Sequence, residues 1–69
     1  MEEWGRVDEE LRELRRRSAD WKYIESLPQR VREAVELYIE TGDLWLSAKL
    51  AGMSAEEFNE IRIRAGLLW

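Results

Sequence analysis

With 69 residues, the chain is long enough for one domain, and a domain this short buries only about 60% of its unfolded surface. It has no cysteine and no histidine, which excludes disulfides and removes the residues that most often act as thiol nucleophile, general base or zinc ligand. The net charge of −4 argues against binding nucleic acid by bulk electrostatics, and the lack of a long apolar run or a signal peptide favours a cytoplasmic protein without a membrane segment.

Residues 1–27 are predicted to form an amphipathic helical arm. After a loose lead-in over residues 1–6, Asp8 is expected to cap a helix, because the acidic residues that follow it suit the positive end of the helix dipole. The seam of this helix follows a 4-3-4-3 spacing, with a small serine in the gap, at Val7, Leu11, Leu14, Ser18 and Trp21. Two heptads are too few for an independent coiled coil, so we expect the seam to lie across a partner surface.

Two features of the arm leave alternatives open. Residues 18–20 either interrupt the helix or continue it. The basic run Arg15, Arg16 and Arg17 is either a solvated face paired with glutamates on nearby turns, or a contact for phosphate or for an acidic partner.

The next helix is predicted over residues 28–41. Pro28 is tolerated in the first turn, since its missing amide hydrogen would have no partner there, and Ser26 with Gln29 fits a capping box. The apolar stripe of this helix repeats at helical spacing: Val31, Ala34, Val35, Leu37, Tyr38 and Ile39. Gly42 is expected to end the helix.

The segment that ends at Gly66 is punctuated as two short helices joined by a tight turn. Asp43 can cap the first helix, and Gly52 can end it in the left-handed conformation that glycine adopts with least strain. Ser54 can start the second helix through a capping box with Glu57. Gly66 then closes it.

This segment has the pattern of a helix-turn-helix. A small residue at Ala48, four positions before Gly52, lets the second helix cross closely over the first, while Phe58 and Ile61 supply apolar contacts between them. Further contacts are expected from Leu44, Ala51 and Met53. With residues 28–66 as a helix plus this motif and residues 67–69 as an apolar tail, we predict one all-α domain of four short helices with a C-terminal helix-turn-helix.

The second half of the chain carries, in order, Leu37-Tyr38, Leu44, Ser47-Ala48, Leu50-Ala51-Gly52-Met53-Ser54, Glu57-Phe58 and Arg64-Ala65-Gly66. Over roughly residues 34–66 it thereby resembles small prokaryotic helix-turn-helix proteins that are predicted antitoxins, often partners of PIN-domain ribonuclease toxins. The chain departs from that family at Trp45 and Leu46, where small or polar residues are usual, and at its N-terminus, where such antitoxins often begin with a β-strand. The resemblance implies an antitoxin that binds its operator.

The last predicted helix is poorly suited to the major groove of DNA. With Phe58 toward the core, its outward face carries Glu56, Asn59, Glu60 and Ile63, of which Asn59 alone suits a base edge. The candidate DNA contacts are therefore few: Lys49, Ser54, Asn59, Arg62 and Arg64. We expect weak DNA binding at most, because two carboxylates would meet phosphates.

The chain has more apolar side chains than one small core needs, even if Leu46 and Leu67 lie inside it. The others are predicted to form a partner or dimer interface: Leu11, Leu14, Trp21, Trp45, Ile63, Leu68 and Trp69. We therefore expect a homodimer and a protein partner, which is a toxin or a second copy of the chain.

No catalytic, cofactor-binding or metal-binding residues can be nominated, because adjacent glutamates on a helix point in different directions and no glycine-rich phosphate loop is present. We therefore expect neither an enzyme nor a small-molecule substrate. The leading hypothesis is an antitoxin-like protein that binds a toxin through apolar segments, with operator DNA as an additional ligand. The alternatives are a homo-oligomeric helical interaction module that keeps the helix-turn-helix shape without binding DNA, and an ordinary DNA-binding regulator.

Overall fold

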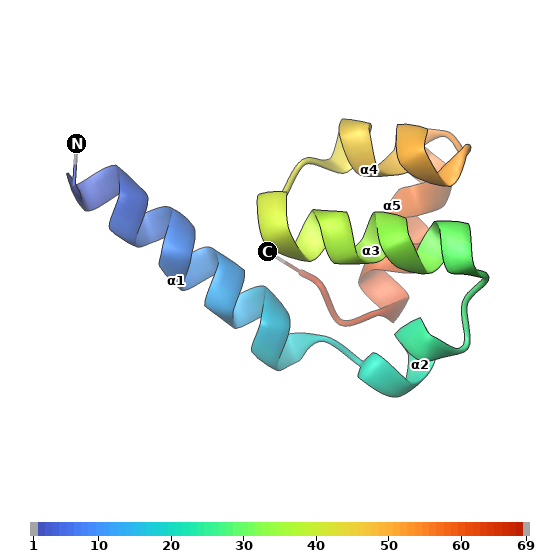
Figure 1. The fold of residues 1–69 in the computed structure, drawn as a ribbon, viewed down its shortest axis with the longest axis horizontal. Coiled ribbons are helices and arrows are strands. Elements are labelled where there is room, and N and C mark those ends of the chain that lie inside the picture. Colours follow the sequence, from blue (N-terminus) through green and yellow to red (C-terminus); the bar gives the residue numbers. More distant parts are fainter. Residues whose placement is uncertain (1, 69) are drawn as a thin grey trace.

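The computed structural model describes the backbone of residues 2–68 and the side chains of residues 8–68. This part of the chain contains no strand and five helices: α1 (Glu2–Ser18), α2 (Trp21–Glu25), α3 (Gln29–Thr41), α4 (Leu44–Ala51) and α5 (Ala55–Arg64). Helices α2 to α5 form the body of the molecule, and α1 extends from it as a long arm (Figure 1). The predicted all-α fold is confirmed.

The predicted number of four helices is wrong, because the arm breaks after Ser18. The two residues that follow are not helical, and α2 begins with Asp20 as its N-cap, whose carboxylate accepts a hydrogen bond from the Tyr23 amide at 3.1 Å. The Asp20 amide donates to the Ala65 carbonyl oxygen at 2.8 Å. The break is therefore anchored to the far end of α5, a contact that no local sequence pattern indicates.

The start of α1 also differs from the prediction. The helix begins at Glu2, so residues 2–6 are not a loose lead-in, and Asp8 lies within the helix instead of capping it. Val7, predicted in the seam, lies outside the described side chains.

Local signals correctly placed the end of α3, both ends of α4 and the start of α5. The Asp43 carboxylate caps α4 by accepting from the Leu46 amide at 3.0 Å. The Ser54 hydroxyl accepts from the Glu57 amide at 3.1 Å, which is one half of the predicted capping box, while the Glu57 carboxylate accepts from the Ser54 hydroxyl at 3.1 Å where a capping box would have it accept from the Ser54 amide. After α4, Gly52 has φ of 73°, and the amide of the following residue bonds back across the last turn, as in a Schellman motif.

One predicted cap is wrong. Ser26 does not form a capping box with Gln29, and Pro28 precedes α3 without a side-chain cap. Ser26 instead ends α2, where its hydroxyl donates to the Tyr23 carbonyl oxygen at 2.5 Å. Because α3 begins at Gln29, this residue is the first of the helix and not the third, and Ser26 lies too far before the helix to cap it.

A single core lies between α2, α3, α4, α5 and the segment after α5. Its buried apolar residues are Ile24, Ala34, Val35, Tyr38, Ile39, Ala48, Ala51, Phe58, Ala65 and Leu67. Phe58 is at its centre, with its ring centroid 6.2 Å from that of Tyr38, and Ile61 packs against the cluster from its edge. Leu67 thus lies in the core as allowed, but the placement of Leu46 there is wrong, since it is 48% exposed.

Candidate interaction surfaces

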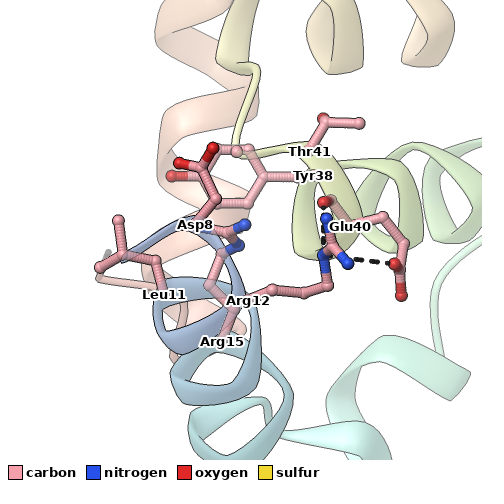
Figure 2. A pocket seen from close by; sticks show the side chains of 8 residues that line it. Asp8, Leu11, Arg12, Arg15, Tyr38, Glu40 and Thr41 are labelled. Carbon is pink, nitrogen blue, oxygen red and sulfur yellow. Dashed lines mark hydrogen bonds and ion pairs between the residues drawn. The ribbon is translucent and has the colours of Figure 1, made fainter. Parts of the chain in front are cut away.

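Arginines of the arm bind the end of α3. The last four carbonyls of a helix have no partner within it, and α1 supplies two donors for them. Arg15 Nε donates to the Ile39 carbonyl oxygen at 2.8 Å, and Arg12 Nε donates to the Glu40 carbonyl oxygen at 3.1 Å. Figure 2 shows both side chains reaching across the hollow of about 450 Å³ between α1 and the end of α3. These cations also suit the negative end of the α3 dipole.

Arg15 is the central residue of this junction. It is only 6% exposed, and its guanidinium carbon lies 5.9 Å from the centroid of the Tyr38 ring, within the range of a cation–π contact. A Cβ atom added to Gly42, which ends α3 with φ of 70°, would lie 3.2 Å from Arg15 Nη1. The backbone at Gly42 therefore allows the guanidinium to approach the helix end closely.

The other two arginines of the basic run form ion pairs. Arg16 donates to the Glu40 carboxylate at 2.6 Å, and this hydrogen bond lowers the pKa of the Glu40 carboxyl below its ordinary value and raises the pKa of Arg16. Arg17 lies 3.4 Å from Glu13, one turn earlier in α1. Pairing with glutamates thus describes Arg16 and Arg17, whereas Arg15 has the buried structural role that neither interpretation of the run included.

A similar arginine lies at the end of α4. Arg30 Nε, from α3, donates to the Leu50 carbonyl oxygen at 2.9 Å, and its guanidinium would lie 3.2 Å from a Cβ atom at Gly52. Sequence reasoning missed Arg12, Arg15 and Arg30 as ligands of helix ends. Their bonds join residues 20 to 28 positions apart, and such distant pairs leave no signal in local spacing.

The outward face of α4 is the most apolar exposed surface of the body. Small residues point inward at Ser47, Ala48 and Ala51, which lets α4 lie close to its neighbours. The four residues on the other side of the helix are exposed: Trp45, Leu46, Lys49 and Leu50. Trp45 is 76% exposed. We call these four residues the α4 face, and Lys49 carries its one charge. The three small inward positions were the signal that could have placed Leu46 and Leu50 outside.

The other residues predicted in a partner interface are spread over the molecule. Leu11 and Leu14 are exposed on α1, Trp21 on α2, Ile63 on α5 and Leu68 after it. Trp69 lies outside the described residues. The Trp21 indole nitrogen donates to the Arg16 carbonyl oxygen at 3.3 Å, so this side chain also bridges the break between α1 and α2. The described residues of the predicted interface are therefore all exposed, but they lie on several different elements of the fold.

The candidate DNA contacts do not form one basic face. The two that are exposed cations are Lys49 on α4 and Arg64 near the end of α5. Arg62 is used inside the chain, because it donates to Asn59 Oδ1 through Nη2 at 2.6 Å and to the Leu67 carbonyl oxygen through Nη1 at 2.6 Å. The Asn59 oxygen is occupied by its hydrogen bond from Arg62, and the Ser54 hydroxyl caps α5.

Within the described residues, no three acidic, histidine or cysteine side chains lie close enough to hold a metal ion. No helix in the described part of the chain has the length and apolarity needed to cross a membrane. Comparisons with protein-family models, with curated proteins and with solved structures gave no match for this chain. The resemblance to helix-turn-helix antitoxins therefore stays a prediction.

Proposed function

We propose that this chain is a non-catalytic binding protein that acts by covering an apolar surface of a protein partner with its α4 face. The observation that carries the proposal is the exposure of Trp45, Leu46 and Leu50 on one side of a helix whose other side is in the core. An exposed tryptophan beside aliphatic side chains is typical of the centre of a protein interface, where a few such residues supply most of the binding free energy.

The family resemblance makes a toxin the expected partner. In that case inhibition needs no chemistry from this chain, because an apolar helix face bound over the toxin surface blocks it sterically. Trp45 and Leu46 are also the positions at which the chain departs from the antitoxin pattern. The α4 face would then determine which toxin is recognised.

The test begins with purification of the protein that binds this chain in its own cells, followed by titration calorimetry of the purified pair. Trp45→Ala should weaken binding at least 30-fold, which corresponds to about 2 kcal/mol for a central interface tryptophan. The matched control is Trp21→Ala, which removes another exposed tryptophan outside the α4 face. Equal loss with the two variants, or loss with Trp21→Ala alone, would refute this use of the α4 face.

A growth assay distinguishes a toxin from another partner. The partner expressed alone should arrest growth, co-expression of this chain should restore it, and the Trp45→Ala chain should fail to do so. A partner with no effect on growth would favour the alternative of an interaction module outside any toxin system.

DNA binding is the second candidate function, and the charges of α5 count against it. Glu56 and Glu60 are exposed, and Arg62 and Asn59 bond to each other. We expect weak binding to the DNA upstream of its gene at physiological salt in an anisotropy assay, with improvement when Glu56 and Glu60 are both replaced by Gln. Nanomolar, sequence-selective binding by the unmodified protein would contradict this and indicate a repressor.

A further inference from the structure

The arm exposes an apolar stripe along an edge that α3 leaves open, and its residue Leu11 also lines the hollow between α1 and the end of α3. Leu11 and Leu14 are 37% and 40% exposed, whereas Arg15, on the neighbouring side of the helix, is buried against α3. At about 100° per residue, the two leucines lie on one stripe, roughly a third of a turn away from the side that carries Arg12 and Arg15. Figure 1 shows α1 diverging from α2–α5 toward its N-terminal end.

Charges of opposite sign flank the stripe at its two ends. On the edge remote from α3, Glu10 lies before Leu11, and Arg17 lies three residues after Leu14. A hollow of about 350 Å³ along this edge is lined by Glu10, Glu13, Leu14 and Arg17. The partner of Arg17 within the chain is Glu13, at 3.4 Å in an exposed pair, and such pairs are weak enough to be exchanged for another carboxylate.

The order of charges along α1 favours one relative direction for two copies of the helix. Beside the stripe, α1 carries the acidic Glu10 toward its start and the basic Arg17 toward its end. In a parallel pair, groups of like sign would lie level with each other. In an antiparallel pair, the acidic end of each helix lies beside the basic end of the other, and opposite charges across a seam determine orientation.

We propose that two copies of this chain pair through α1, antiparallel and related by a twofold axis. Leu11 of each copy packs against Leu14 of the other, and Glu10 of each copy forms an ion pair with Arg17 of the other. In heptad terms the leucines are the core positions, and Glu10 and Arg17 are the flanking positions that face each other in an antiparallel pair. Pairing leaves the arm docked, because it does not use the side chains that bond to α3, which are Arg12, Arg15 and Arg16.

The seam is short and buries less area than a standard interface. We therefore expect a weak dimer, with a Kd on the order of tens of micromolar. It uses none of the α4 face, so a protein partner and the second copy can bind together. This inference stands apart from the proposed function, because Trp45 is not part of the seam.

Sedimentation equilibrium with charge-reversed chains tests both the surface and its direction. Glu10→Arg alone and Arg17→Glu alone should each weaken self-association at least 10-fold, since each sets like charges against each other twice per dimer. An equimolar mixture of the two variants should associate as a heterodimer about as well as the wild-type homodimer, because both cross-pairs become attractive again. The double variant, Glu10→Arg with Arg17→Glu, should also recover the wild-type Kd.

The matched control is Glu9→Arg, which reverses an exposed charge on the opposite side of α1 and should leave Kd unchanged. Circular dichroism melts should show that all variants remain folded. A wild-type chain that stays monomeric at millimolar concentration would overturn the proposal, as would a mixture of the single variants that fails to associate. If Trp45→Ala abolished self-association and the α1 variants had no effect, the dimer interface would lie on the α4 face, and the proposal would also be refuted.

Discussion

In the body of α2 to α5 the buried side chains are almost all apolar, whereas the one buried side chain of residues 8–18 of the arm is Arg15. The body is stabilised by the removal of apolar surface from water, which scales with the apolar area buried and has little directionality. The arm is docked through hydrogen bonds from Arg12 and Arg15 to two carbonyl groups of α3. Such bonds are directional and few, so single side chains should control the position of α1 while leaving the body folded.

The largest effect is expected from removing the central side chain of the body. Phe58 is fully buried, and Phe58→Ala should destabilise the protein by about 3–5 kcal/mol through lost burial and the cavity left behind. This is comparable to the whole stability expected of so short a chain, so the variant should be largely unfolded in a urea titration followed by circular dichroism. Leu46→Ala, at an exposed site, is the control and should change stability by about 0.5 kcal/mol or less. Similar costs for the two would mean that the core is not centred on Phe58.

The junction between the two regions is tested by a pair of glycines. Gly66 and Gly52 have φ of 79° and 73°, so Ala at either should cost about 1–2 kcal/mol from backbone strain. A Cβ atom at Gly66 would also meet the Ser18 carbonyl oxygen at the end of α1, a backbone atom that cannot move alone, whereas at Gly52 it meets the flexible Arg30 side chain. We expect a total of about 2–4 kcal/mol for Gly66→Ala. Equal thermal shifts for the two variants would show that α1 does not closely approach Gly66.

The docking of the arm is tested by Arg15→Met, which keeps the length of the side chain but removes its donors. The lost hydrogen bond to the Ile39 carbonyl should cost about 1.5–3 kcal/mol. Hydrogen exchange in dilute protein should become about 10- to 100-fold faster in α1 and stay unchanged in α3 to α5. Arg17→Met is the control, because Arg17 does not contact α3. A uniform acceleration over the whole chain would mean that arm and body unfold together.

A buried polar side chain in the body leads to a prediction of the opposite sign, a substitution that should stabilise the protein. The Ser47 side chain is fully buried, and its hydroxyl has no hydrogen-bond partner among the residues that the structure describes. Ser47→Ala removes that hydroxyl with almost no change in volume and should stabilise the protein by about 0.5–1 kcal/mol. The melting temperature measures this directly. A lower melting temperature would reveal a stabilising contact of the hydroxyl.

The smallest effect concerns the exposed ion pair of the arm. Because Arg16 lowers the pKa of Glu40 in the folded chain, the pair stabilises the docked arm above the ordinary glutamate pKa of about 4.3. This contribution is lost as the pH falls through the lower folded value. Glu40→Gln should therefore speed hydrogen exchange in α1 slightly at pH 6, and the difference from wild type should shrink toward pH 3. A difference independent of pH would exclude the charge of Glu40 as its cause.

Most of what sequence predicted correctly depends on groups a few residues apart. The caps at Asp43 and Ser54 and the left-handed glycines at Gly42 and Gly52 follow from hydrogen bonds and backbone sterics within one turn, so local pattern was sufficient to place them. Helical spacing likewise identified Phe58 as a core residue. The exposure of Leu11 and Leu14 was expected from the spacing of the arm's seam. The exposure of Trp45 was expected from the excess of apolar residues, because a short chain cannot bury every large apolar side chain.

The sequence by itself thus determined the all-α class, the end of α3, both ends of α4, the start of α5 and the excess of apolar surface. Tertiary structure decided the features that depend on groups distant along the chain. At the break after Ser18 the Asp20 amide bonds to the Ala65 carbonyl oxygen, and Arg15 of the basic run bonds to an open carbonyl at the end of α3. Leu46 lies outside because the small residues of α4 face the core, where neighbouring helices leave no room for larger ones. Which donor meets which unpaired carbonyl is settled only when the helices pack, since all of these groups bond equally well to water in the unfolded chain.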